Sequence, residues 1–194
     1  KVKVMPYAQG NSLYYSKDPD NLKKLSRLLV FQSIIQMHPD YCCNFVLDYK
    51  YNGGDLTQFV TVPERIVKIC YSEEDLTKQS EFINNEIRSR TNNILGSCES
   101  IEEFNALMAK YDSAGEYYVV VHIFGCTALP QQLLNNIRNG PRVGYFFKFY
   151  WTIEEMQNLK DVLPLDAMLE FYEVIDNPVP RMPAVVRRLV EGPT

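Results

Sequence analysis

The chain has 194 residues, which is enough for one domain with a sizeable apolar core. Apolar residues make up 46% of it and charged residues 23%, a globular composition that excludes a largely disordered chain. The formal net charge of −4 gives no support to nucleic-acid binding driven by overall charge, and the apolar runs are too short to span a bilayer.

Short apolar segments alternate with helix-like segments along the chain. Residues 1–5 alternate polar and apolar side chains, as an edge strand does, and residues 6–11 have the composition of a turn. Further strands are predicted at residues 12–16, 44–48, 65–70, 117–124, 144–150 and 168–174. Strands that alternate with helices predict an α/β fold, with a mostly parallel sheet and helices on both of its faces.

Local capping signals mark where the predicted helices begin. Asp18-Pro19 places a carboxylate before a proline at the first helical position, and this helix ends near His38. Its second half is apolar on nearly all sides, which predicts that it is deeply packed. Another helix is predicted at residues 130–138. Three more begin at capping boxes formed by Ser72 and Asp75, Ser100 and Glu103, and Thr152 and Glu155.

The most apolar predicted strand lies at residues 117–124 (YYVVVHIF). It lacks alternation, so we expect it in the middle of the sheet, covered on both faces. The end of the chain is different, because residues 177–183 are proline-rich and residues 184–190 (AVVRRLV) are typical of the start of a helix or of a linker. We therefore expect one domain at residues 1–176 and a proline-rich, basic tail or linker at residues 177–194.

Four segments, taken together, carry a family resemblance. Residues 44–50 (NFVLDYK) are similar to a strand ending in Asp-Phe-Lys, and residues 72–95 to a later helix with Glu and Arg near its end. Residues 117–124 stand at the position of a Walker B strand. Residues 137–149 (IRNGPRVGYFFKF) resemble a helix end, a Gly-Arg-like turn and a returning strand. In this order and spacing, the chain resembles the FtsK/SpoIIIE motor ATPases over most of its length.

The resemblance implies a RecA-like P-loop architecture, a ring-forming ATPase ancestry and a role in moving DNA or secreted protein. Type VII secretion ATPases, which join several such domains and include degenerate ones, are similar. The resemblance also implies a larger parent chain with neighbouring ATPase domains, a homo-oligomer of that parent, and a cytoplasmic location whether or not the parent is membrane-associated. We expect no membrane contact by this fragment itself.

The predicted phosphate loop departs from the family pattern. A working loop reads GxxxxGK[ST], because its backbone N–H groups wrap the phosphates and its lysine neutralises their charge. The corresponding residues here include no glycine, and the proline lacks an N–H. Carboxylates at the start of the helix satisfy its free amides in place of a phosphate and repel ATP. The degenerate nucleotide-binding positions in this loop are Ser16, Lys17, Asp18, Asp20 and Asn21.

The other two parts of a nucleotide site also depart from the pattern. A Walker B strand ends in an acidic pair that holds Mg²⁺ and polarises water, but the apolar strand here continues into His122 and Ile123. His122 is a candidate metal ligand or base, or else a packed residue. Asp48 and Lys50 match the family's Asp-x-Lys at the carboxyl end of a strand, where open α/β folds bind ligands. The alternative is that Asp48 caps the following loop and Lys50 is solvated.

Four arginines are candidates for contacts with partners. Arg142, in the turn NGPRVG, is a candidate to face a neighbouring subunit, and a plain surface arginine is the alternative. Arg181, Arg187 and Arg188 are candidates for contacts with nucleic-acid phosphates, which makes DNA a weakly supported partner.

Most other site chemistries lack the necessary residues. The sequence has two histidines, His38 and His122, and neither a Ser-His-Asp set nor clustered metal ligands are visible. We therefore expect no catalytic residues and no metal site. The cysteines are odd in number and lack CxxC spacing, which predicts free thiols in a reducing compartment. They are Cys42, Cys43, Cys70, Cys98 and Cys126.

These observations favour a degenerate ATPase-fold module of a larger DNA-translocase or secretion-motor protein. Such a module is structural or regulatory, hydrolyses no ATP of its own and needs no cofactor. Two alternatives stay open. One is an active ATP-dependent DNA translocase domain that binds ATP and Mg²⁺ at a divergent site, and the other is an unrelated α/β domain that binds a small ligand at its strand ends.

Overall fold

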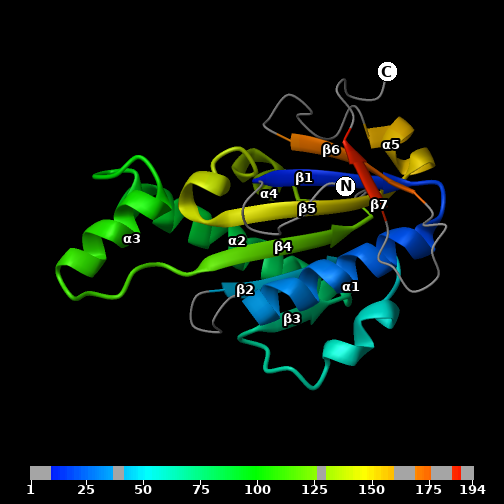
Figure 1. The fold of residues 1–194 in the computed structure, drawn as a ribbon, viewed down its shortest axis with the longest axis horizontal. Coiled ribbons are helices and arrows are strands. Elements are labelled where there is room, and N and C mark those ends of the chain that lie inside the picture. Colours follow the sequence, from blue (N-terminus) through cyan, green and yellow to red (C-terminus); the bar gives the residue numbers. More distant parts are fainter. Residues whose placement is uncertain (1–9, 37–41, 126–129, 160–168, 176–184, 189–194) are drawn as a thin grey trace.

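The computed structural model describes residues 10–36, 42–125, 130–159, 169–175 and 185–188, which form one sheet with helices on both sides (Figure 1). The strands are β1 (Asn11–Ser16), β2 (Cys42–Asp48), β3 (Val67–Cys70), β4 (Tyr118–Phe124), β5 (Tyr145–Thr152), β6 (Leu169–Ile175) and β7 (Val185–Arg188). The helices are α1 (Pro19–Gln36), α2 (Glu73–Ile94), α3 (Ile101–Lys110), α4 (Gln131–Asn136) and α5 (Ile153–Leu159), with 3-10 helices η1 (Gly54–Phe59) and η2 (Pro141–Val143). The strand predicted at residues 1–5 lies outside the described residues.

The strands form a seven-stranded sheet in the order β3-β2-β4-β5-β1-β6-β7. All neighbouring pairs are parallel except β6 and β7, which are antiparallel. The prediction of a mostly parallel sheet is therefore confirmed. β4 has β2 on one side and β5 on the other, as its uninterrupted apolar sequence predicted.

Helices cover both faces of the sheet, which confirms the predicted α/β class. On one face, α1 and η1 bury apolar side chains against the strands, including Leu22, Leu25, Leu29, Leu56 and Phe59. On the other face, α2, α4 and α5 contribute Ile83, Ile87, Leu133, Leu134 and Met156. Figure 1 shows α1 in front of the sheet and α2 behind it. Each face thus has its own apolar core, and the sheet separates the two.

A row of stacked aromatic rings crosses the sheet beneath α1. The rings of Phe124 and Tyr150 lie 4.8 Å apart, those of Tyr150 and Tyr14 5.5 Å, and those of Tyr14 and Tyr172 5.5 Å. These residues come from β4, β5, β1 and β6, which are consecutive in the sheet. The parallel register places them at one level, so that each ring packs on the next strand's ring.

The packing of α1 differs from the prediction. Leu29 and Val30 are buried, but Phe31 is 53% exposed and Ile35 is 64% exposed. The expectation that the whole second half is deeply packed is wrong, because the helix rests on the sheet with one side and turns the other side outward. Phe31, together with Leu28 and Ile34, lines a groove against η1.

The predicted capping boxes are present. Ser72 Oγ accepts a hydrogen bond from the N–H of Asp75, and Ser100 Oγ accepts one from the N–H of Glu103. At α5 the box is reciprocal, since Thr152 Oγ1 accepts from the N–H of Glu155 while Glu155 Oε2 accepts from the N–H of Thr152. These bonds satisfy amides that a helix leaves free at its start, which explains why the sequence located these helices well.

Two segments adopt structures that the sequence did not indicate. The segment after β2 forms the 3-10 helix η1 (Gly54–Phe59). The segment expected to start a helix or linker instead forms β7, which pairs antiparallel with β6. Strand formation there depends on backbone partners from β6, and no local pattern in residues 184–190 contains that information. The division into residues 1–176 and 177–194 stays a prediction.

Candidate functional site

The turn that leads from β1 into α1 is closed by its own side chains. The N–H of Asp20 donates to Asp18 Oδ1 at 2.9 Å, and the N–H of Asp18 donates to Ser16 Oγ at 3.1 Å. The N–H of Asn21 donates to the carbonyl of Asp18 at 3.2 Å. Lys17 is exposed and lies before the first helical residue. The amides that a phosphate would contact therefore have partners within the turn itself.

Asp48, at the end of β2, is committed to the loop that follows it. It is 3% exposed, and its Oδ1 accepts from the N–H groups of Lys50 at 3.0 Å and Tyr51 at 2.7 Å. Its Oδ2 accepts from the N–H of Gly53 at 2.6 Å. With these three bonds, Asp48 caps this loop. This is the alternative given for Asp48 in the sequence, rather than a ligand contact at the strand end.

An edge cluster of Lys23, Lys50, Tyr51 and Glu155 lies beside these groups at the carboxyl end of the sheet. Lys50 Nζ is 2.7 Å from Glu155 Oε1, and the ring of Tyr51 faces Lys23 Nζ at 4.4 Å and Lys50 Nζ at 5.4 Å. Burial alone lowers the pKa of Lys50, but the hydrogen bond and charge of Glu155 raise it above its ordinary value. Lys50 is thus paired rather than simply solvated, and its charge is already compensated.

The Tyr51 ring anchors the edge cluster to the sheet. It packs edge-on against Phe124, with ring centroids 5.8 Å apart, and burial raises the pKa of its hydroxyl. Lys23 also approaches Asp20 Oδ1 at 3.8 Å, which connects the cluster to the turn before α1. The side chains of three segments that are separate in sequence therefore contact one another in front of the strand ends.

His122 lies inside the protein, two residues before the end of β4. Its Nδ1 is 2.8 Å from the hydroxyl of Tyr150, and its Nε2 is 3.1 Å from Asn44 Oδ1. Since the Asn44 oxygen only accepts, Nε2 carries the hydrogen and Nδ1 accepts from Tyr150. Burial lowers the pKa of His122 to about 3, so the ring is neutral at pH 7. It is a packed, hydrogen-bonded residue, and Phe124 occupies the last position of the strand.

Lys148 is a buried lysine that sequence analysis missed. Its Nζ donates to the carbonyl of Gly10 at 2.6 Å and to Ser12 Oγ at 3.2 Å. Burial lowers its pKa to about 7, while the nearby Glu170 acts in the opposite direction. The available signal was a single lysine inside an otherwise apolar strand, whose residues are all buried.

At the level of sequence, no family profile and no curated protein matches the chain. Solved structures do match it. The cytoplasmic domain of the type VII secretion ATPase EccC from Thermomonospora curvata superposes with a TM-score of 0.69 at 11% identity, over 91% of this chain and 20% of that one. EssC (ATPases 2 and 3) from Geobacillus thermodenitrificans gives 0.64 at 16% identity, over 94% of this chain and 38% of that one.

A third match is T. curvata EccC (ATPases 2 and 3) in complex with a signal sequence peptide. Its TM-score is 0.69 at 12% identity, over 89% of this chain and 31% of that one. The chain has the fold of a type VII secretion ATPase domain. It spans between a fifth and two fifths of the length of these three chains. The expected RecA-like P-loop architecture is thereby confirmed.

Within this type VII ATPase fold, the remaining predicted residues are dispersed. Arg142 is exposed, and its Nε and Nη2 both donate to the carbonyl of Glu99 at 3.3 Å. Arg187 and Arg188 lie on β7, opposite Glu173 and Tyr172 of β6. Arg181 lies outside the described residues. Among the described residues, the side chain of Arg142 bonds Glu99 and not the turn before α1.

Within residues 10–36, 42–125, 130–159, 169–175 and 185–188, no group of three or more His, Cys, Asp and Glu side chains is placed to hold a metal ion. In the same part of the chain, no helix combines the length and apolar character needed to cross a membrane. Among the described residues, four cysteines are buried free thiols, namely Cys42, Cys43, Cys70 and Cys98, and Cys126 lies outside these residues.

One pocket does open at the carboxyl edge of this fold, with a volume of about 350 Å³. It lies on the β2 and β3 side and is lined by Asp48, Tyr49, Asn52, Tyr71, Glu73, Leu76, Thr77 and Pro130. None of residues 16–21 lines it. Among the described residues, its lining carries two carboxylates and no lysine or arginine, which is unfavourable for a triphosphate.

Proposed function

We propose that this domain is a non-hydrolysing ATPase-fold module of a larger secretion-motor chain, with a structural or regulatory role. The observation that carries the proposal is the hydrogen bond from the N–H of Asp20 to Asp18 Oδ1. In a working phosphate loop, the amides at the start of this helix bind the nucleotide. Here a carboxylate of the same turn satisfies one of them and places negative charge where the phosphates would lie.

Two further features support the loss of hydrolysis. β4 ends in Phe124 followed by Gly125, so the position that would hold Mg²⁺ and polarise water has no acidic side chain. Asp48 has both carboxylate oxygens bonded to backbone amides of its own loop. We therefore expect neither ATP nor Mg²⁺ to be a cofactor of this domain.

The role in a larger chain rests on the comparisons. EccC and EssC carry this fold as part of chains that are much longer than the present one, and two of the structures contain ATPases 2 and 3 together. We propose by analogy that this domain has adjacent ATPase domains of its own parent chain as partners, and that it lies on the cytoplasmic side. The same analogy favours protein cargo over DNA.

Calorimetric titration with ATP tests the nucleotide part of the proposal. We expect no binding heat at millimolar ATP, with or without Mg²⁺, and no phosphate release above the background of buffer. A domain with an intact GxxxxGK[ST] loop, titrated in the same buffer, serves as the positive control. Saturable heat that disappears in the Lys17→Ala variant would refute the proposal, since it would place a nucleotide against this turn.

A further inference from the structure

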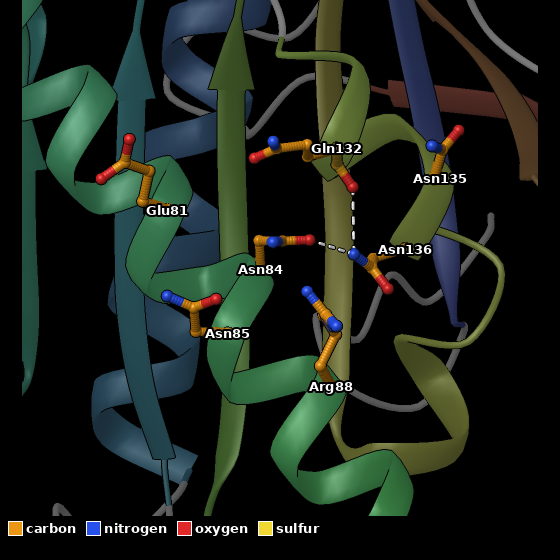
Figure 2. Close-up of a pocket in the computed structure, with 7 residues that line it drawn as sticks. All are labelled: Glu81, Asn84, Asn85, Arg88, Gln132, Asn135 and Asn136. Carbon is orange, nitrogen blue, oxygen red and sulfur yellow. Dashed lines mark hydrogen bonds between the residues drawn. The ribbon is translucent and has the colours of Figure 1, made fainter.

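A second polar region lies on the opposite face of the domain. A cleft of about 540 Å³ opens between α2 and α4, behind the sheet as seen from α1 (Figure 2). Its lining consists of five carboxamide side chains, one acid and one arginine, namely Asn84, Asn85, Gln132, Asn135, Asn136, Glu81 and Arg88. No member of the edge cluster lines it, so this cleft is separate from the nucleotide position.

The floor of the cleft is a fixed pair of amides. Asn84 is 7% exposed, and its Oδ1 accepts a hydrogen bond from Asn136 Nδ2. Asn136 Nδ2 also donates to the carbonyl of Gln132 at 3.0 Å, one turn earlier in α4. Figure 2 shows the two asparagines pointing toward each other across the gap between the helices. The bond joins residues 52 positions apart and holds α4 against α2.

This pair leaves hydrogen-bonding capacity for a ligand. A carboxamide offers two N–H donors and an oxygen with two acceptor sites. The Asn84–Asn136 bond uses the oxygen of the first and the nitrogen of the second. The amide hydrogens of Asn84 and the side-chain oxygen of Asn136 have no partner in the part of the chain that the structure describes. A donor and an acceptor therefore remain side by side.

The rim carries opposite charges at its two ends. Glu81 and Arg88 are seven positions apart on α2, a rise of about 10 Å along the helix axis. Both are exposed, and neither forms an ion pair with the described residues. Asn85 and Gln132 add exposed carboxamides between these ends. The lining thus has no net charge but has a clear polarity along its length.

The composition of the lining selects among ligand classes. The described residues of the lining include no aromatic side chain, so they offer no stacking surface for a nucleobase or a sugar ring. Its single arginine is opposed by a glutamate, which is unfavourable for phosphate groups. Carboxamides instead match the peptide group, because each pairs a donor with an acceptor. An extended chain rises about 3.3 Å per residue, so about three residues fit between the charged ends.

We propose that the α2–α4 cleft binds an extended peptide segment through its main chain. The Asn84–Asn136 pair, with Asn85 and Gln132, hydrogen-bonds peptide N–H and C=O groups. Arg88 contacts an acidic side chain of the segment, and Glu81 contacts a basic side chain about three residues away. The cleft does not depend on the nucleotide position, so the module binds such a segment whether or not it binds ATP.

Nuclear magnetic resonance titration tests this proposal on the whole chain. The probe is a capped peptide of about four residues, with lysine and aspartate at its ends and two serines between, so that the charged side chains are about three residues apart, as the cleft requires. We expect saturable shifts in the side-chain NH₂ signals of Asn84, Asn85 and Gln132. Arg88→Gln should weaken binding about three- to tenfold, because it removes a charge-assisted contact. Asn85→Ala should weaken it by about threefold, the loss of one hydrogen bond.

Matched controls separate this site from general surface effects. Arg27→Gln makes the same change on α1, and Asn92→Ala removes another exposed carboxamide of α2, so neither should alter binding. A probe methylated on its central main-chain nitrogens should bind at least about fivefold more weakly, since it lacks the N–H donors. Shifts confined to other surfaces, equal binding of the methylated probe, or no shifts at millimolar peptide would each overturn the proposal.

Discussion

The carboxyl edge of the sheet and the α2–α4 cleft use similar polar groups in opposite ways. At the edge, Asp18 and Asp48 bond amides of their own loops, and Lys50 is paired with Glu155. In the cleft, Glu81 and Arg88 lie on the rim without ion pairs among the described residues, and the amides of the floor keep spare capacity. The first region is satisfied within the chain, and the second is not.

The contrast teaches where to look for binding in a fold whose usual site has changed. The number of charges near a strand end says little, because short-range bonds within a turn can use all of them. What matters is how many donors and acceptors remain once the chain's own bonds are formed. By that criterion, the edge contributes mainly to stability, and the cleft is available for recognition. The predictions below test this division in order of expected effect.

The largest effect is expected for Asp48→Ala. The change removes the acceptor of three backbone N–H groups, of which that of Gly53 is buried and those of Lys50 and Tyr51 are partly buried, so we expect a loss of about 3 kcal/mol in the free energy of unfolding. Urea unfolding measures it, and Glu81→Ala, which removes an exposed carboxylate from α2, is the control. A loss below about 1 kcal/mol would break the comparison, since it would mean that the carboxylate is not committed to the loop.

The second largest effect is expected from Lys148, which should make the free energy of unfolding depend on pH. Its pKa is about 7 in the folded protein against 10.5 ordinarily, so the unfolded state binds more protons between these values and stability rises with pH. From pH 7 to 8 we expect a gain of up to about 1 kcal/mol. Burial raises the pKa of the Cys42 and Cys43 thiols to about 12. Above pH 8 these thiols therefore keep their protons in the folded state while they lose them in the unfolded state, which opposes the gain in stability from Lys148.

The Lys148→Met variant isolates this contribution. Urea unfolding of the variant at pH 7 and at pH 8 should give a smaller difference than the original chain gives, whatever its absolute stability. An unchanged difference would show that Lys148 is charged in the folded state at both pH values, and the description of its site would then be wrong.

Asp18→Ala sharpens the comparison at the turn before α1. Losing this side-chain acceptor should cost about 0.5 to 1 kcal/mol, as for other helix caps. The freed amides should then bind an anion, so sulfate should raise the melting temperature of the variant more than that of the original chain. Equal sulfate effects on both proteins would mean that the carboxylate does not occupy an anion position.

The smallest effect is expected in the cleft. Asn85→Ala should change the free energy of unfolding by less than about 0.5 kcal/mol, because alanine favours the helix and the exposed amide supports no part of the fold. Thermal and urea unfolding measure it. A loss above about 1 kcal/mol would assign Asn85 a structural role and weaken the case that the cleft is free for a ligand.

The sequence predicted the strands, the helix starts and the closed turn because these depend on neighbouring residues. Ser72 and Asp75 lie within one turn, and so do Asp18 and Asp20. It did not predict β7, whose partner β6 precedes it across residues 176–184, or the commitment of Lys148 to Gly10 and Ser12. The cleft was also missed, since its floor depends on α2 and α4 meeting in space.

The aromatic row beneath α1 contributes an optical signal that depends on the packing of the sheet. Four stacked rings on β4, β5, β1 and β6 couple their electronic transitions, and this coupling gives a near-ultraviolet circular dichroism signal that depends on lateral strand register. The far-ultraviolet signal reports mainly on the helices. Recording both during unfolding distinguishes strands that separate first from helices that melt first, without an added probe.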